Sequence, residues 1–151
     1  MPTRKALRLP HFDYSRAGAY FVTICLHERR PLFGRLREDA VSLSPVGRVV
    51  DEEIRAIALR HPGVTVDAAV VMPDHVHALI LLPGNGATLG AVVGAFKSQS
   101  ARRANMLRSR EGEPFWQRGF FEHVVRDDHD LLRIRIYIAQ NPLRWSVARA
   151  T

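Results

Sequence analysis

The chain has 151 residues, of which 46% are apolar and 25% charged, and it carries a formal net charge of +7. This length and composition suit one folded domain with its own core, and they exclude a disordered chain or a solenoid of tandem repeats. The excess of lysine and arginine favours a polyanionic partner, with nucleic acid as the first candidate, over a merely arginine-rich surface.

No segment predicts a membrane or secreted protein. The longest apolar run is too short, and too polar at two histidines, to span a bilayer. Residues 1–17 read as a basic arm that lacks the apolar stretch of a secretory signal. The single cysteine, Cys25, lies in an apolar run and can form no internal disulfide. We therefore expect a cytoplasmic protein, with residues 1–151 forming one domain.

The first half of the chain predicts strands followed by a helix. Residues 20–26 are aromatic and β-branched, which is typical of a strand, and residues 32–43 predict a weaker extended pair. Ser44 and Pro45 begin a helix as its N-cap and first residue. Apolar residues then recur at helical spacing until Pro62.

The middle of the chain predicts two strands, a helix and a partly extended segment. Residues 64–72 and 75–82 are strands joined by a tight connection, which makes them antiparallel neighbours. Residues 88–109 form a basic helix capped by Thr88. Residues 115–125 are partly extended.

A last helix begins at Asp127 or Asp128 and is predicted to end at Asn141, because Pro142 follows. The order of elements is then strand, extended pair, helix, two strands, helix, short strand and helix. This order resembles a ferredoxin-like α+β sandwich, in which helices pack on a central antiparallel sheet.

Two histidines separated by one residue, His75 and His77, interrupt the apolar strand over residues 75–82. Alternate residues of a strand share a face, so both imidazoles can reach one metal ion. A single core histidine is usually only a hydrogen-bonded polar residue, whereas two on one face also fit a metal-binding or catalytic role. The spacing alone leaves both interpretations open.

Tyr137 and Asn141 lie four positions apart in the last helix and share one of its faces. A phenol can act as a nucleophile that leaves a covalent intermediate, and an amide oxygen beside it can complete a metal site. Taken alone, Tyr137 is more readily explained as an amphipathic core residue. A catalytic role for this pair is indicated only when it is considered together with the two histidines.

The combination resembles a known family. Residues 71–77 resemble the HUH motif of single-strand DNA nucleases, in which a hydrophobic residue separates two histidines. Residues 137–142 resemble the Tyr-x-x-x-Asn/Gln motif of the single-tyrosine, IS200-like transposases. The chain most resembles the REP-associated tyrosine transposases, and further similar stretches cover residues 7–14, 18–24, 93–98, 116–118, 122–126 and 141–145.

The resemblance implies a metal-dependent endonuclease and strand transferase that cuts single-stranded DNA beside a hairpin. It implies that His75, His77 and Asn141 hold Mg²⁺ or Mn²⁺, and other divalent ions also suit imidazole ligands. It also implies that Tyr137 attacks phosphorus, which gives a 5′-phosphotyrosine and a free 3′-OH. Mobile relatives often carry Gln as the third ligand; here Asn141 matches it, since Gln140 points about 100° away on a helix.

The oligomeric state is open at this point. Some relatives exchange the tyrosine helix between subunits, so both a monomer and a homodimer fit the sequence. Tyr137 would then act beside its own histidines or beside those of a partner.

Basic residues suggest where DNA binds. We expect residues 88–109 and 115–126 to form the main DNA surface, because arginines there interleave with aromatic rings suited to base stacking. The N-terminal arm would reach a hairpin or its flank. The candidate phosphate contacts are Arg4, Lys5, Arg8, Lys97, Arg102, Arg103, Arg118 and Arg126. Each of them also fits a solvated surface charge.

Three other functions fit parts of the pattern. A non-catalytic DNA- or RNA-hairpin-binding protein would keep the basic surface, but all four site residues are retained here. A histidine-dependent nucleotide hydrolase would have a third histidine where Leu79 stands. A replication or conjugation nuclease of the HUH class is usually larger and multidomain. The sequence therefore favours the transposase.

Overall fold

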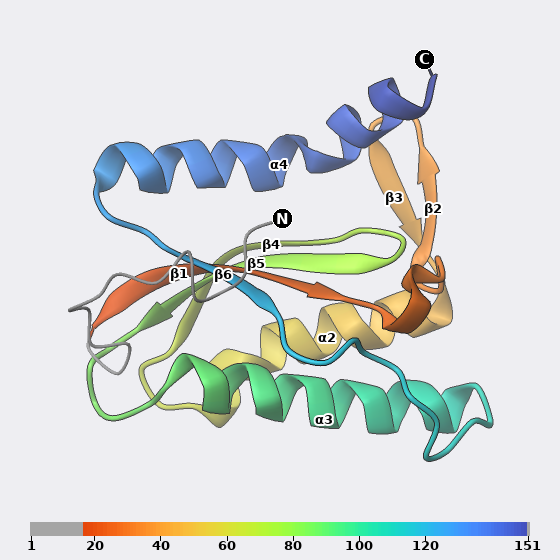
Figure 1. Cartoon of the computed structure of the whole chain (residues 1–151), viewed down its shortest axis with the longest axis horizontal. Coiled ribbons are helices and arrows are strands. Elements are labelled where there is room, and N and C mark those ends of the chain that lie inside the picture. The colour runs from red at the N-terminus through yellow and green to blue at the C-terminus, as the bar shows by residue number, and fades with distance from the viewer. Residues whose placement is uncertain (1–16, 151) are drawn as a thin grey trace.

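The computed structural model describes the backbone of residues 17–150 and the side chains of residues 17–143. The predicted arm therefore lies almost entirely outside the described residues. In chain order the elements are β1 (Gly18–Cys25), the 3₁₀ turn η1 (His27–Arg29), β2 (Gly34–Arg37), β3 (Ala40–Leu43), α2 (Pro45–Arg60), β4 (Thr65–Val71), β5 (His75–Leu82), α3 (Leu89–Leu107), β6 (Phe121–Val124) and α4 (Asp128–Ala150) (Figure 1).

Four strands form one antiparallel sheet in the order β4-β5-β1-β6, so β5 and β1 are central. Cys25 stands opposite His75 in the β1–β5 register, and β6 pairs with the other side of β1. Helix α2 connects β1 to β4 by way of the β2–β3 ribbon, and α3 connects β5 to β6. This is the ferredoxin-like arrangement. The predicted α+β sandwich, with the histidine motif on a central strand, is confirmed.

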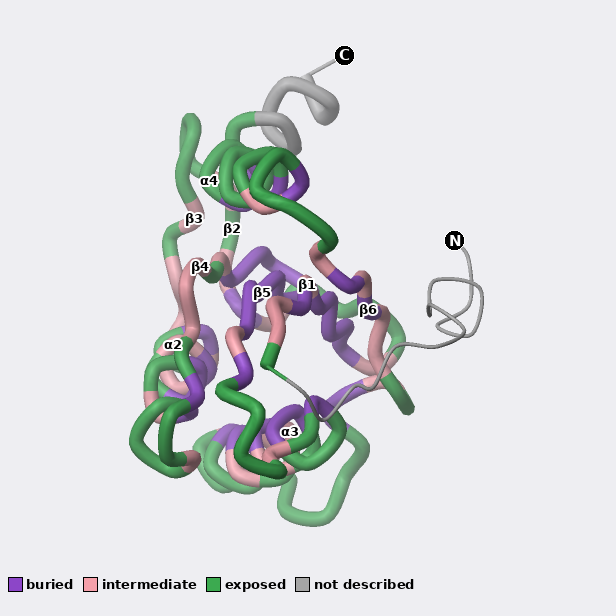
Figure 2. The backbone as a smooth tube through the Cα atoms, turned by 90° about the vertical axis from the view of Figure 1, so that its left-hand side faces the viewer, coloured by how far each residue is buried: buried purple, intermediate pink, exposed green. Residues whose placement is uncertain are grey.

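The two faces of the sheet pack against different helices. One face contributes alternate residues such as Tyr20 and Val22 to the larger core, which α2 and α3 complete. The opposite face carries Leu79, which packs with Ile134 and Ile138 of α4. Figure 2 shows the strands between α4 on one side and α2 and α3 on the other. Because alternate residues share a face, the two histidines of β5 lie beneath α4.

Helix α2 begins as the sequence predicts. The Ser44 hydroxyl accepts a hydrogen bond from the backbone N–H of Gly47 at 3.0 Å, and Pro45 is the first helical residue. The predicted extended pair is the separate ribbon of β2 and β3. No helix in the described part of the chain is long and apolar enough to cross a membrane.

The last helix differs from the prediction. The sequence predicts an end at Asn141, whereas α4 continues through Pro142 to Ala150. A proline inside a helix removes one hydrogen bond and clashes with the carbonyl four residues earlier, so it can kink a helix without ending it. Figure 1 shows the C-terminal part of α4 turning away from the axis of its first part.

Candidate active site

His75 and His77 stand next to each other on β5, on the face beneath α4. Their ring centroids are 4.7 Å apart and the ring planes meet at 73°. Both residues are buried, with exposed fractions of 9% and 6%. The spacing in the sequence thus places two imidazoles side by side within the protein.

Each imidazole has an oxygen atom at its Nδ1. His75 Nδ1 lies 2.7 Å from Asp74 Oδ1, and His77 Nδ1 lies 2.8 Å from Thr23 Oγ1. Thr23 stands opposite His77 in the β1–β5 register, so the sheet itself fixes the second contact. Metal-binding histidines commonly make such contacts through the nitrogen that does not bind the metal. The pair therefore fits a metal ion at Nε2 of both rings.

Electrostatics support a neutral imidazole at His77 and an ionised carboxylate at Asp74. Burial lowers the pKa of His77 to about 3, and Coulombic repulsion from Arg29, and from His75 whenever that ring is protonated, acts in the same direction. Neutral imidazole is the form that binds metal ions. Burial acts to raise the pKa of Asp74, but hydrogen bonds from His75 and Arg29 outweigh it, so this pKa lies below its ordinary value. Asp74 is therefore a carboxylate at neutral pH.

Sequence analysis missed Thr23, Arg29 and Asp74. Asp74 directly precedes His75, so its position was a usable signal for a carboxylate beside a metal ligand. Arg29 lies in η1, far away in the chain, and its Nε donates to Asp74 Oδ2 at 3.0 Å. Only the pairing of β1 with β5 brings Arg29 and Thr23 to the site.

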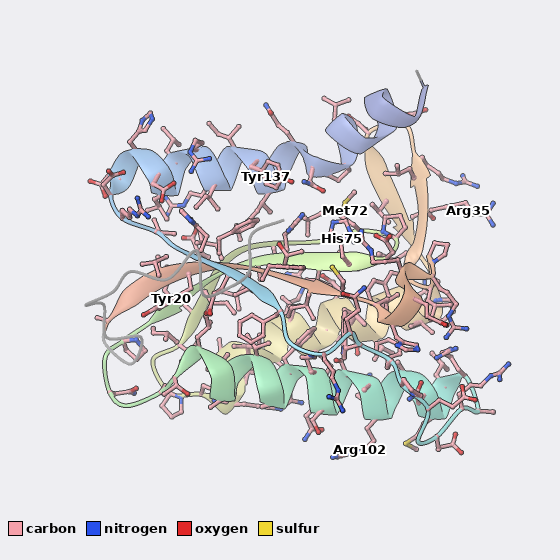
Figure 3. The ribbon with its side chains drawn as sticks, in the orientation of Figure 1. Tyr20, Arg35, Met72, His75, Arg102 and Tyr137 are labelled. Carbon is pink, nitrogen blue, oxygen red and sulfur yellow. The ribbon has the colours of Figure 1, made fainter. Side chains whose placement is uncertain are left out.

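Helix α4 places Tyr137 over the histidine pair. The Tyr137 ring lies edge-on to His77 and Phe21, with centroid distances of 5.5 Å and 6.0 Å. Tyr137 is 38% exposed, whereas Asn141, one turn later, is 7% exposed. Figure 3 shows Tyr137 and His75 in the layer between α4 and the sheet. The structure thus brings the predicted nucleophile to the predicted metal ligands within one chain.

An amide side chain near the two histidines can supply a third metal ligand. Within the described side chains, no group of three or more histidine, cysteine, aspartate or glutamate residues could hold a metal ion. Asn141 is buried on the helix that covers the histidines, and an amide oxygen suits Mg²⁺ and Mn²⁺. The residues present therefore fit a divalent ion with two imidazole ligands and one oxygen ligand.

An ion pair attaches α4 to the sheet close to Tyr137. Arg135 donates from Nε and Nη2 to the two carboxylate oxygens of Asp67 at 2.7 Å and 2.8 Å. Asp67 is the extra residue where the register of β4 against β5 shifts. A bidentate pair of this kind fixes direction as well as distance. The pair therefore attaches α4 to β4 at Arg135, which is two residues before Tyr137.

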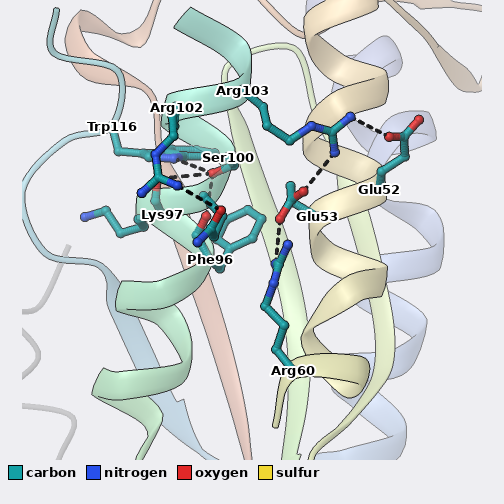
Figure 4. Close-up of polar contacts among 10 residues, drawn as sticks. Glu52, Glu53, Arg60, Phe96, Lys97, Ser100, Arg102, Arg103 and Trp116 are labelled. Carbon is teal, nitrogen blue, oxygen red and sulfur yellow. Dashed lines mark hydrogen bonds and ion pairs between the residues drawn. The ribbon is translucent and has the colours of Figure 1, made fainter. Parts of the chain in front are cut away.

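The predicted phosphate contacts on α3 lie on the other face of the sheet from Tyr137 (Figures 1 and 2). Lys97 donates to the backbone oxygens of Gln117 and Gly119 at 2.7 Å and 2.9 Å. Arg103 pairs with Glu52 and Glu53 of α2, both at 2.8 Å (Figure 4). Lys97 and Arg103 thus have partners within the chain.

Three of the remaining predicted phosphate contacts can be placed in the structure. Arg102, Arg118 and Arg126 are exposed, whereas Arg4, Lys5 and Arg8 lie outside the described residues. The aromatic rings of this region are only partly available: Phe115 and Trp116 are buried in the larger core, and Phe120 and Phe121 are half-buried. Phosphate contact by these basic residues stays a prediction.

Comparisons with known proteins agree on one family. Residues 19–141 match the model of the family described as transposase IS200 like. An uncharacterized protein of Haemophilus influenzae is 31% identical over 163 residues, covering 94% of this chain and 89% of that protein. A second protein of that organism, named "Putative REP-associated tyrosine transposase", is 30% identical over 140 residues, covering 87% and 74%.

The fold is also similar to a solved one. The structure of a REP-associated tyrosine transposase bound to a REP hairpin superposes with a TM-score of 0.67 at 22% identity, covering 91% of this chain and 73% of that chain. The residues matched by the family model include His75, His77, Tyr137 and Asn141.

Proposed function

The chain belongs to the IS200-like transposase family, and we propose that it cuts and rejoins single-stranded DNA beside a hairpin, with Tyr137 as the nucleophile. One observation carries this proposal: the ring of Tyr137 lies 5.5 Å from that of His77, beside a buried pair of imidazoles. A core tyrosine packed for stability alone would not need two buried histidines beneath its ring.

Tyr137 would attack the phosphorus atom of one phosphodiester. The tyrosine hydroxyl loses its proton as its oxygen forms a bond to phosphorus, the bond between phosphorus and the 3′-oxygen breaks, and the 3′-oxygen leaves and takes up a proton, so no net proton is consumed. The products are a 5′-phosphotyrosine and a free 3′-OH. Because the phosphodiester character is retained, a 3′-OH can later attack the phosphotyrosine and rejoin strands without a nucleotide cofactor.

His75, His77 and Asn141 would hold a divalent ion, Mg²⁺ or Mn²⁺, in this proposal. When bound, such an ion supplies a Lewis acid that neutralises charge on the scissile phosphate. Thr23 and Asp74 orient the two imidazoles through their Nδ1 atoms. The Arg135–Asp67 pair holds α4 so that Tyr137 faces the same place.

The proposed substrate is single-stranded DNA that carries a hairpin. The net charge of +7 suits a polyanion, and the solved relative is bound to a REP hairpin. Arg102, Arg118 and Arg126 are the exposed candidates for phosphate contact. A cytoplasmic location, where such DNA is available, belongs to the same proposal.

A covalent-adduct assay tests the proposal. The chain is mixed with a labelled single strand containing a hairpin and its flanks, in Mn²⁺ or in EDTA, and separated on a denaturing gel. We expect a labelled protein band in Mn²⁺ only. Tyr137→Phe is expected to abolish the band while DNA binding persists. Tyr14→Phe, which makes the same change at a tyrosine of the basic N-terminal arm, should retain the band.

Two results would contradict the proposal in different ways. An adduct formed by Tyr137→Phe would assign the nucleophile elsewhere. Tight hairpin binding by the unmodified chain, without any adduct in Mn²⁺, would favour a non-catalytic hairpin-binding protein.

A further inference from the structure

Asp74 connects the histidine pair to an arginine outside it. One of its carboxylate oxygens, Oδ1, lies 2.7 Å from His75 Nδ1, and the other, Oδ2, accepts from Arg29 Nε at 3.0 Å. The Asp74 side chain is 13% exposed, whereas that of Arg29 is 49% exposed. Both oxygens of this nearly buried carboxylate are therefore engaged by cationic or N–H groups.

The backbone around Asp74 is held from the same side. Leu26 donates to the carbonyl of Asp74 and Phe33 to that of Pro73, both at 3.0 Å. These two donors precede and follow Arg29 in the chain. The segment after β1 therefore binds the connection between β4 and β5 through backbone hydrogen bonds. Arg29 itself has φ of 54°, a left-handed conformation that is unfavourable for a residue with a Cβ and persists only where its surroundings enforce it.

We propose that Asp74, held in place by Arg29, is a positioning residue that keeps the His75 proton on Nδ1 and leaves the Nε2 lone pair for the metal ion. This inference rests on the metal site of the proposed function. An ionised carboxylate can only accept hydrogen bonds, so the Nδ1 atom facing it must be the one that carries the proton. The neutral ring then has its lone pair on Nε2, as a metal ligand requires.

The same contacts place Asp74 beside the Nδ1 atom of His75 and not beside its Nε2 atom. Oδ1 faces His75 and Oδ2 faces Arg29, so both oxygens of the carboxylate already have a hydrogen-bond partner in the chain. Asp74 is therefore placed to orient His75, and Asn141 stays the proposed oxygen ligand.

The two histidines differ in this respect. The partner of His77 is the Thr23 hydroxyl, which can either donate or accept, so it does not fix the position of the His77 proton. We therefore expect His75 to hold its proton on Nδ1 already in the metal-free protein, whereas His77 can adopt either tautomer.

The test measures metal affinity and tautomer, neither of which needs DNA. Mn²⁺ is titrated into the unmodified chain, Asp74→Ala and Arg29→Gln, and the protonated ring nitrogen of His75 is identified by ¹⁵N NMR in the metal-free proteins at neutral pH. The matched control is Asp51→Ala: Asp51 also accepts from an arginine Nε, that of Arg55 at 3.2 Å, but on α2.

We expect Asp74→Ala to weaken Mn²⁺ binding by about 10- to 100-fold. This is the loss typically seen when a carboxylate that is hydrogen-bonded to a metal-binding histidine is removed. His75 should also lose its preference for a proton on Nδ1. Arg29→Gln should change both readouts in the same direction and by less, since it releases Asp74 without removing it. The control should match the unmodified chain.

Unchanged Mn²⁺ affinity and an unchanged His75 tautomer in Asp74→Ala would overturn the inference. If Asp74→Ala does not fold, Arg29→Gln decides, because its side chain lies at the surface. A failure of the unmodified chain to bind Mn²⁺ would instead contradict the metal site of the proposed function. The NMR measurement on metal-free protein would still test the positioning role.

Discussion

The phenol ring of Tyr137 lies edge-on to the imidazole of His77 in the same chain, with 5.5 Å between the ring centroids. Within one chain, the predicted nucleophile therefore lies beside a predicted metal ligand. We predict that mixing Tyr137→Phe with His77→Ala restores no covalent adduct, since neither chain contains a complete site. The adduct assay on the mixture measures this, with each variant alone as the control. Recovery of adduct in the mixture would show that the tyrosine acts on the histidines of another subunit.

Asn141 is buried one turn after Tyr137, and Gln140 beside it is exposed. If Asn141 supplies the third ligand, Asn141→Ala should weaken Mn²⁺ binding strongly. The loss should exceed the roughly 10- to 100-fold that is typical when a residue hydrogen-bonded to a metal ligand is removed. Gln140→Ala should change the affinity little, because Gln140 points about 100° away on the helix. Calorimetric titration of Mn²⁺ compares the two variants. A larger loss for Gln140→Ala would reverse the assignment.

The Arg135–Asp67 pair fixes α4 beside the site without contacting the histidines. We predict that Arg135→Gln lowers the rate of cleavage, by up to about 100-fold, because a nucleophile displaced by an ångström loses much of its effective concentration. Mn²⁺ affinity should stay unchanged, which separates a misplaced tyrosine from a damaged metal site. Arg133→Gln, which removes a pair with Asp130 within α4, is the control. Equal cleavage rates for both variants would contradict this role.

Local periodicity accounts for what the sequence predicts correctly about the site. The strand period of two places His75 and His77 on one face, and the helical period places Tyr137 and Asn141 together. Neither period specifies that the helix lies over the strand, and the family resemblance was needed to join the two pairs. Arg29 contacts Asp74 only because β1 and β5 pair, which no local pattern reveals.

The charge pattern locates basic residues but does not reveal their partners. It predicts a DNA surface on the basic helix over residues 88–109, and α3 packs on the face of the sheet opposite Tyr137. Arg103 is engaged by two carboxylates that lie some 50 positions earlier in the chain, so its partners were not visible in the local sequence. The end predicted at Asn141 was wrong because a proline can kink a helix that tertiary contacts maintain.

Glu53 links α2 to α3 and gives the fold a predictable acid sensitivity. Its side chain, 4% exposed, accepts from Arg60 at 2.6 Å and from Arg103 at 2.8 Å (Figure 4). Burial acts to raise the pKa of Glu53, but the hydrogen bonds and charges of the two arginines outweigh it, so the pKa lies below its ordinary value of 4.5. The unfolded chain therefore takes up the proton first as the pH falls.

The stabilisation by Glu53 is thus complete above pH 4.5 and is lost as the pH falls through the lower pKa of the folded state. We predict that Glu53→Gln lowers the free energy of unfolding at pH 7 by about 1.5–3 kcal/mol, the usual contribution of hydrogen bonds to a charged group. Glu52→Gln, at a side chain that is 62% exposed, should change it by less than about 1 kcal/mol. Urea unfolding of the three proteins at pH 7 and pH 3 measures both effects. The difference in the free energy of unfolding between Glu53→Gln and the unmodified chain should be smaller at pH 3, because protonation of Glu53 removes the same charge as the substitution. A difference that does not change with pH would contradict the role of this carboxylate.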